Sequence, residues 1–593
     1  MAWRLDHGLD LATLAAAYAA GLRPSEVVDA VLQAIEARGE DHVWIGGALA
    51  DHARAAARRL EGLDRTALPL YGVPFAIKDN IDVAGLTTTA ACPGFAHVAK
   101  TTAPVVAALE EAGAILVGKT NLDQFATGLS GCRSPYGIPA NALAPAMIPG
   151  GSSSGSAVAV AAGLVGFALG TDTAGSGRVP AMLNNLVGLK PTRGLLGTRG
   201  VVPACRSLDC VSIFALNAAD AGAVLAVAEG FDPADPFSRR RGPGIAAIRR
   251  LGVPRAGDLD FDGDDAAAGL FAAAVDRARA LGATLVEIDL TPFVEAAKLL
   301  YDGPWVAERT AALRTMLANA PDALHPVTRR IVMGGLERTA VEAFEGAYRL
   351  AELRRATEPV WDDVDALLLP TAPTAYTIEA MLADPIGLNS RLGHYTNFVN
   401  LFDLAAIAVP AGFLESGVGF GVTLVAPAWS EPALLAAGDT LHRAAGTGMG
   451  AAKRVLPEAK PPAPERFPLV VCGAHMQDLP LNVQLTERGA VFVETTRTAP
   501  DYRLYALPGA PARPGLVRTA ANDGAAIEVE VWDLPVEAIG SLLALVPAPL
   551  GFAPVRLADG RLRHGFVCEA AAVGDARDIT HLGGWRAHLA ATG

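Results

Sequence analysis

Cysteine is scarce in this sequence, with six residues among 593. A small secreted domain held together by disulfides needs a much higher density, so we expect a reduced, cytoplasmic protein. Cys205 and Cys210 stand five positions apart, but no second cysteine pair and no histidine pair accompanies them to complete a zinc site. The sequence therefore predicts neither a bound metal nor a cofactor.

Long apolar runs are also missing. No stretch of about 18 charge-free apolar residues occurs, which argues against a membrane-spanning helix. The apolar residues 11–20 form a short stretch that follows Asp6 and Asp10 rather than a basic segment, so they indicate a buried helix and not a signal peptide. We expect no membrane partner and no export.

Positive charge is in deficit, since 49 basic residues face 62 acidic ones and the net charge is −13. This balance argues against a nucleic-acid partner bound through phosphate contacts. Charged residues make up 19% of the chain and hydrophobic residues 51%, which excludes an intrinsically disordered protein. A chain of this length exceeds one hydrophobic core, so at least two domains are expected.

The order of the patterns predicts where those domains lie. Residues 1–455 alternate helix and strand patterns, which favours an α/β sheet covered by helices, with a mainly helical lobe at about 266–360. Residues 231–265 are rich in proline, glycine and aspartate and are expected to form a crossing loop. Residues 456–468 have the proline and charge content of a linker. Residues 469–593 are expected to form a smaller, β-rich α+β domain.

Several elements are predicted individually. Helices are expected at 11–20 and 25–37, and a helix followed by a strand at 104–118. A short strand at 71–79 ends at Lys78, and further strands are expected at 360–370 and 405–410. In the C-terminal domain the predicted strands are 469–472, 491–494, 502–507, 526–532 and 563–569.

Two loops of small residues flank the apolar segment 157–169: Pro149-Gly-Gly-Ser-Ser-Ser-Gly-Ser and Gly170-Thr-Asp-Thr-Ala-Gly-Ser-Gly-Arg. Backbone without bulky side chains approaches a ligand closely and directs N–H groups into a cavity. A phosphate-binding loop would need Gly-Lys-Ser/Thr, which is absent, and a flexible linker would not border such apolar sequence. Nucleophilic catalysis fits better, with many serines available and Lys78 as a candidate base, although a strand-end lysine alone is weak evidence.

Together with Gly72-Val-Pro-x-x-Ile-Lys-Asp, these loops resemble the amidase signature family over roughly residues 10–450, and the fold implied is that family's mixed sheet. By this resemblance Ser176 is the nucleophile, Ser152 relays its proton after a cis peptide bond, and neutral Lys78 is the base. Such a lysine needs a pKa about three units below its usual 10.4, which burial can supply. The amides of Thr173, Ala174, Gly175 and Ser176 would form the oxyanion hole, and Asp172 and Arg178 would pair to brace the loop.

The segment Ala174-Gly-Ser-Gly-Arg-Val-Pro-Ala-Met-Leu-Asn-Asn is similar to the allophanate hydrolase branch of this family. Residues 467–593, with Gly473-Ala-His-Met-Gln-Asp-Leu-Pro-Leu-Asn, are similar to that branch's C-terminal domain. The resemblance implies that Tyr301 and Arg309 clamp the carboxylate of the small substrate allophanate, because arginine offers a planar two-point contact. The competing interpretation of Arg309 is a surface arginine, solvated or paired with Glu308.

The same resemblance implies two steps: ammonia release in the amidase domain, then decarboxylation of N-carboxycarbamate assisted by the C-terminal domain. His475 is the candidate proton shuttle there, although a structural histidine is about equally expected. Asn482 is expected either to bind substrate or to cap the following turn. Another amidase, a tRNA-amidotransferase A-type subunit and a non-catalytic scaffold are the alternatives. We expect a homodimer, and a urea carboxylase as a separate chain, because no biotin-carboxylase region appears.

Overall fold

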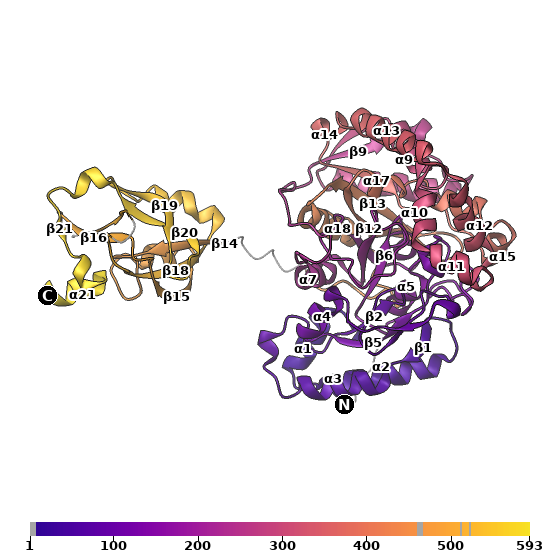
Figure 1. Ribbon diagram of the computed structural model, residues 1–593, viewed down its shortest axis with the longest axis horizontal. Coiled ribbons are helices and arrows are strands. Elements are labelled where there is room, and N and C mark those ends of the chain that lie inside the picture. Colours follow the sequence, from indigo (N-terminus) through magenta and orange to yellow (C-terminus); the bar gives the residue numbers. More distant parts are fainter. Residues whose placement is uncertain (1–6, 459–465, 510–512, 521–522, 593) are drawn as a thin grey trace. The chain divides into compact units, whose positions relative to one another are not determined.

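The structure, a computed structural model, describes residues 7–458, 466–509, 513–520 and 523–592. The chain divides into two compact units, Met1–Pro457 and Glu458–Gly593, and the second unit is coloured orange to yellow in Figure 1. Within the predicted linker 456–468, residues 459–465 lie outside the described residues. The domain boundaries drawn from the sequence stay predictions.

The N-terminal unit contains a mixed sheet of eleven strands. In spatial order these are β1 (Trp44–Ala48), β5 (Ile115–Thr120), β2 (Pro74–Lys78), β6 (Phe167–Asp172), β8 (Cys210–Ala215), β7 (Val187–Lys190), β12 (Leu404–Phe413), β13 (Gly419–Pro427), β11 (Ala366–Pro370), β9 (Arg250–Pro254) and β10 (Thr284–Ile288). A small hairpin pairs β3 (Thr87–Thr88) with β4 (His97–Val98). The α/β class with a mixed sheet, predicted from the sequence, is confirmed.

Strand β2 lies between β5 and β6 and runs parallel to both. Lys78 is paired with Thr120 of β5, and Ile77 is paired with Leu169 of β6. Because parallel strands end at the same edge of a sheet, the residues at the ends of β2 and β6 come together there. The register therefore places Lys78 beside the loop that follows β6.

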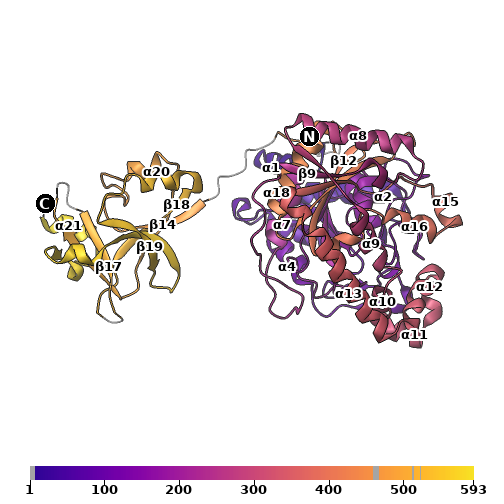
Figure 2. The ribbon, with the colours of Figure 1, turned by 90° about the horizontal axis from the view of Figure 1, so that it is seen from above.

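Helices surround the sheet, and Figures 1 and 2 show them from two directions. They are α1 (Leu11–Ala19), α2 (Pro24–Arg38), α3 (Ala50–Leu60), α4 (Pro104–Glu111), α5 (Ser154–Ala161), α6 (Val179–Leu183), α7 (Ala218–Ala228), α8 (Asp265–Ala280), α9 (Thr291–Leu299), α10 (Trp305–Ala312), α11 (Arg314–Asn319), α12 (Pro326–Gly334), α13 (Ala340–Thr357), α14 (Val360–Asp363), α15 (Ile378–Ala383), α16 (Gly387–Leu392), α17 (Phe398–Leu401) and α18 (Glu431–Ala445).

Both faces of the sheet are buried, and strand β12 shows how. Its residues Ala405 and Ile407 belong to the core cluster that includes Leu434 of α18, whereas Ala406 belongs to a second cluster with Phe398 of α17. Side chains alternate between the two faces of a strand, so a strand covered on both faces is apolar throughout. This explains why the central strands are continuous apolar runs in the sequence.

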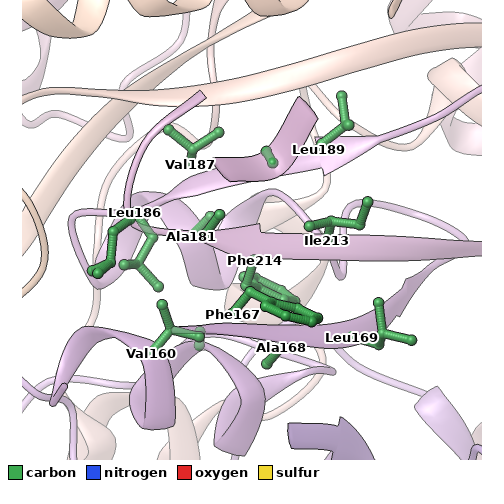
Figure 3. Packing of buried hydrophobic residues seen from close by; sticks show 14 of the residues in the cluster. Val160, Phe167, Ala168, Leu169, Ala181, Leu186, Val187, Leu189, Ile213 and Phe214 are labelled. Carbon is green, nitrogen blue, oxygen red and sulfur yellow. The ribbon is translucent and has the colours of Figure 1, made fainter. Parts of the chain in front are cut away.

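The core beneath the glycine-rich loops is tightly packed. Figure 3 shows Val160 of α5, Phe167 of β6 and Phe214 of β8 directed toward one another. The ring of Phe167 also stacks on that of Phe75 in β2, with centroids 5.1 Å apart and planes 11° apart. This packing anchors strands β2 and β6, which end at Lys78 and Asp172.

Three predicted segments differ from the structure. The segment 231–265, expected to be a loop, contains strand β9. The segment expected to begin a strand at Val360 begins with helix α14, and β11 starts only at Ala366. Residues 266–360 are mainly helical but also supply strand β10 to the edge of the sheet. The apolar residues of β9 and β10 are short runs inside polar sequence, which hides them from periodicity.

The C-terminal unit contains two further sheets. A five-stranded sheet has the order β15 (Val491–Arg497), β18 (Glu528–Pro535), β14 (Arg466–Val471), β20 (Leu562–Cys568) and β19 (Leu550–Arg556). A three-stranded sheet joins β17 (Arg513–Arg518), β16 (Tyr502–Leu507) and β21 (Arg577–Asp578), and the helices are α19 (Val483–Thr486), α20 (Ile539–Leu543) and α21 (Trp585–Thr592). Strands β17 and β19 were not predicted, because Pro514 and Pro554 interrupt their patterns.

No helix in the described part of the chain is long and apolar enough to cross a membrane.

Candidate active site

Lys78 is completely buried at the end of β2. Its Nζ lies 2.7 Å from Ser152 Oγ and donates a hydrogen bond to Thr171 Oγ1, also at 2.7 Å. Burial disfavours the charged ammonium and lowers the pKa of Lys78 from 10.5 to about 7, although the carboxylates of Asp123 and Asp209 act to raise it. Near neutral pH a large share of Lys78 is therefore a neutral amine that can accept a proton.

Ser152 follows a cis peptide bond from Gly151 and, like Lys78, has no exposed surface. Ser176 is 2% exposed, and its Oγ lies 3.5 Å from the carbonyl oxygen of Gly128. Among the described residues no hydrogen bond joins the hydroxyls of Ser152 and Ser176. The structure thus brings Lys78 and Ser152 into direct contact, and a relay from Ser176 to Ser152 stays a prediction.

The glycine before Ser152 is required by its surroundings. A Cβ atom on Gly151 would lie 2.2 Å from Asp123 Oδ2 and 2.4 Å from the amide nitrogen of Gly131. The buried Asp123 organises this region: its own N–H donates to the carbonyl of Ser152 at 3.0 Å, and its carboxylate accepts the N–H groups of Gly131 and Arg133. The Gly-Gly-Ser sequence thus follows from close backbone packing.

A buried ion pair braces the loop that carries Ser176. Arg178 donates to both carboxylate oxygens of Asp172, at 2.9 and 3.0 Å, as the sequence predicted. The same carboxylate accepts the N–H of Gly175 at 2.8 Å. Gly175 has φ +137°, and a Cβ there would lie 2.4 Å from Thr396 Oγ1, so only glycine fits.

This bonding changes the predicted oxyanion hole. Because the N–H of Gly175 is bound by Asp172, it is not available to a substrate. The amides of Thr173, Ala174 and Ser176 have no hydrogen-bond partner in the parts of the chain that the structure describes. The candidate oxyanion donors are therefore these three amides.

Asp209 was not predicted from the sequence, and it holds the loop that carries Thr173 and Ser176 in place. Its fully buried carboxylate accepts a hydrogen bond from Thr173 Oγ1 at 2.5 Å and the amides of Ala204 and Cys205 at 2.9 and 3.1 Å. Burial raises the pKa of Asp209, against the opposing effect of these hydrogen bonds. Its bond to Thr173 fixes the first residue of the candidate oxyanion loop.

Tyr301 and Arg309 are in contact, and their implied role as a clamp for the substrate carboxylate stays a prediction. Arg309 lies in α10, is 1% exposed, and donates to the Tyr301 hydroxyl at 3.2 Å and to Thr127 Oγ1 at 3.2 Å. Its guanidinium carbon lies 5.0 Å from the centre of the Tyr301 ring. Glu308 points elsewhere and accepts hydrogen bonds from Ser207. Arg309 is consequently neither a surface arginine nor the partner of Glu308.

A cavity of about 430 Å³ is lined by Tyr301 but not by Arg309. Tyr301 and Arg133 line it together with Asn389, and the exposed residues Asp302 and Glu337 also line it. Lys78, Ser152 and Ser176 are not among its lining residues. The Tyr301 hydroxyl connects the cavity to Arg309.

The C-terminal unit has a cavity of its own, of about 230 Å³, lined by His475, Gln484, Arg513 and Phe566 among others. His475 Nε2 lies 3.0 Å from Gln484 Oε1, and the imidazole stacks on Phe566 with ring centroids 4.8 Å apart. Burial lowers the pKa of His475. A neutral imidazole with one nitrogen engaged by an amide is suited to proton transfer at the other nitrogen.

Asn482 does not cap the following turn, and its expected role in binding substrate stays a prediction. It precedes α19 but its side chain caps no helical N–H; instead its Nδ2 donates to the carbonyl of His475 at 2.8 Å. Nor is it among the residues that line the cavity. Asn482 therefore supports the loop that carries His475.

No group of three or more His, Cys, Asp or Glu side chains in the described residues is arranged to hold a metal ion. Cys205 and Cys210, considered above for zinc, are both buried free thiols.

Both units of the chain match known protein families. The family model described as Amidase matches residues 26–435, and the model of the allophanate hydrolase C-terminal domain matches residues 467–590. A solved structure of an allophanate hydrolase variant from Kluyveromyces lactis is 37% identical, covers 99% of this chain and 98% of its own, and superposes with a TM-score of 0.74. The fold class is thereby confirmed.

Urea amidolyase of Saccharomyces cerevisiae is 42% identical over 552 residues, which are 89% of this chain but 30% of the yeast protein. This chain thus spans about 30% of the length of the fungal urea amidolyases that it matches. The A-type subunit of glutamyl-tRNA(Gln) amidotransferase from Chloroflexus aurantiacus is 34% identical over 480 residues, 74% of this chain and 96% of that protein. On these matches, the chain belongs to the amidase family and carries an allophanate hydrolase C-terminal domain.

Proposed function

We propose that this protein hydrolyses allophanate to ammonia and carbon dioxide. The observation that carries the proposal is Arg309: its buried guanidinium is near enough to Lys78 to lower the pKa of that lysine, and its hydrogen bonds among the described residues go only to the hydroxyl groups of Thr127 and Tyr301. Asp209 and Glu308 act on its charge but form no ion pair with it in the described chain, so its N–H groups can still bind a substrate carboxylate. Allophanate supplies a carboxylate one NH group away from its amide carbonyl.

In the first step, Lys78 takes the proton of Ser152 as Ser152 takes that of Ser176. The Ser176 oxygen attacks the carbonyl carbon of the urea-derived amide, and the oxyanion accepts hydrogen bonds from the amides of Thr173, Ala174 and Ser176. Ammonia leaves with a proton returned through Ser152. Water then attacks the acyl-enzyme by the same proton route, which frees Ser176 and N-carboxycarbamate.

In the second step, N-carboxycarbamate takes up a proton and loses one carbon dioxide to give carbamate, which takes up a second proton from water and decomposes to ammonia and a second carbon dioxide. We assign assistance of this decarboxylation to the C-terminal cavity. His475 supports the assignment, because its half-buried ring lines that cavity and its Nε2 is engaged by Gln484. Arg513 lines the same cavity and has no ion-pair partner among the described residues, so it offers a positive charge to a carboxylate.

The alternative amidase activities fit less well. An amidase for neutral amides has no evident use for a buried arginine without an ion-pair partner. Glutamine carries a carboxylate, so Arg309 does not separate allophanate hydrolysis from an A-type amidotransferase role, and the matched C-terminal domain is what favours the allophanate branch. Allophanate would come from carboxylation of urea, so a urea-carboxylating enzyme is the proposed upstream partner. The homodimer and the cytoplasmic location stay predictions.

The test is ammonia release from allophanate by the wild-type protein and by Ser176→Ala. Deleting the attacking oxygen should reduce turnover to below about a thousandth while the circular dichroism spectrum is unchanged. Residual turnover above that level would contradict the nucleophile assignment. Release from glutamine but not allophanate would favour an amidotransferase role instead.

A further inference from the structure

A second buried arginine, Arg133, lies on the loop that follows the short helical turn Gln124–Ala126. It is 2% exposed and lines the cavity of about 430 Å³ that Tyr301 also lines. Its NH1 donates to the carbonyl of Thr127 at 2.8 Å and its NH2 to the carbonyl of Pro385 at 2.5 Å. The buried Nε has no hydrogen-bond partner among the described residues.

Thr127 connects the two arginines. Its carbonyl accepts from Arg133, and its hydroxyl accepts from Arg309. The Nε of Arg309 is likewise buried and without a partner in the described chain. Two guanidinium groups thus converge on one residue, and each leaves an N–H group unused.

Neither guanidinium forms an ion pair with a carboxylate in the part of the chain that is described. Asp123 is the acidic side chain whose charge most affects Arg133, but its two oxygens already accept the backbone amides of Gly131 and Arg133. Burial lowers the pKa of Arg133, and the positive charge of Arg309 acts in the same direction. Buried arginines with a structural role are normally paired, as Arg178 is with Asp172.

We propose that Arg133 is a second anion-recognising residue of the N-terminal site, which together with Arg309 selects substrates that carry a carboxylate over neutral amides of the same shape. The inference rests on the proposed function and names the substrate class that its site accepts. The exposed acids Asp302 and Glu337 line the same cavity. Their negative charge would repel anions in general, so an anion is held there only where the two arginines bind it.

The experiment compares allophanate with biuret, in which a carboxamide replaces the carboxylate. Arg133→Gln removes the charge but keeps an amide donor for the carbonyls of Thr127 and Pro385. It should raise KM for allophanate at least about tenfold with kcat within about threefold, because hydrogen bonds to charged groups are worth that much. Biuret kcat/KM should stay within about threefold. Arg133→Lys, which keeps the charge, should lie between Arg133→Gln and wild type.

Arg338→Gln is the matched control. Arg338 lines the same cavity but is only half-buried and already paired with Glu342. Its replacement should therefore change kcat/KM by no more than about twofold for either allophanate or biuret. Equal losses for allophanate and biuret in Arg133→Gln would overturn the proposal, because they would show that Arg133 only supports the loop. A lysine variant as impaired as the glutamine variant would overturn it too.

A binding measurement keeps the proposal testable without turnover. In the Ser176→Ala protein, malonate should raise the melting temperature more than its neutral analogue malonamide, and Arg133→Lys should reduce that difference. An undiminished difference would refute the role of Arg133. If wild-type protein released no ammonia from allophanate but bound malonate through Arg133, the proposed function would fail while this inference stood.

Discussion

The pH dependence of turnover should report the ionisation of Lys78. With a pKa of about 7, half of Lys78 is a neutral amine at pH 7, whereas an ordinary lysine with a pKa of 10.5 would be about 0.03% neutral. Only the neutral amine accepts a proton from Ser152. The kcat/KM for allophanate should therefore rise about tenfold per pH unit below pH 7 and level off above it.

Two charge substitutions should move this limb in opposite directions. The carboxylate of Asp209 raises the pKa of Lys78, so Asp209→Asn should shift the limb to lower pH. The guanidinium of Arg309 lowers that pKa, so Arg309→Gln should shift the limb to higher pH, in addition to weakening substrate binding. Opposite displacements are difficult to explain by general damage to the fold.

Stability gives an independent readout of the same pKa. Lys78 has a folded-state pKa below its unfolded value, so its contribution to the free energy of unfolding falls as pH drops from about 10.5 to 7. The full difference is on the order of 5 kcal/mol. Lys78→Met should remove this penalty and raise the melting temperature at pH 7 by more than at pH 10, while abolishing turnover. A flat kcat/KM profile from pH 5 to 9 in the wild type, or an unchanged limb in an active Lys78→Ala enzyme, would refute the assignment of Lys78 as base.

Three further outcomes are expected. Arg309→Lys should raise KM for allophanate by about tenfold or more, since an ammonium cannot reproduce the planar two-point contact. Steady-state kinetics with allophanate and with the neutral biuret check this, and an equal loss of kcat/KM for both would show that Arg309 is only structural. Burial, with a further contribution from Asp10, raises the pKa of Asp220 to about 8, so the wild type loses stability as pH rises from about 4 to 8. Asp220→Asn should therefore stabilise the protein at pH 8 by at least about 1 kcal/mol but have little effect at pH 4. Thermal melts at both pH values check this, and a larger gain at pH 4 would contradict it. His475→Ala should leave the release of the first ammonia unchanged but delay the release of carbon dioxide. Simultaneous release of both products by this variant in one time course would show that the C-terminal unit takes no part in the reaction.

Much of the N-terminal fold could be predicted because its central strands are covered on both faces. Strand β2 and the strand–helix alternation around it appear in the sequence as apolar runs between glycine-rich loops. Strands β9, β10, β17 and β19 could not be predicted in this way. Strands β10, β17 and β19 lie at sheet edges, and β9 is a short strand between β11 and β10 whose pairing is decided by neighbours distant in sequence.

The candidate site divides along the same line. Lys78, Ser152 and Ser176 stand in motifs of unusual composition, so their sequence context is informative. Thr171 stands inside one of these motifs but was given no role, and Asp209 stands in ordinary sequence; only the fold shows that one contacts Lys78 and the other Thr173. The role of Gly175 was mistaken for a related reason: its small size favoured an inward amide, but Asp172 binds that amide.

In the N-terminal unit, whether a buried charged side chain has an ion-pair partner distinguishes structural from candidate functional groups better than its residue type does. Arg178 is matched by Asp172, and Lys119 by Asp79, so each charge is compensated inside the fold. Arg309 and Lys78 have no ion-pair partner among the described residues: Arg309 donates to hydroxyl groups while Asp209 and Glu308 act on its charge without pairing, and Lys78 avoids charge through a lowered pKa. Their proximity supports the proposal that an anionic substrate completes this site.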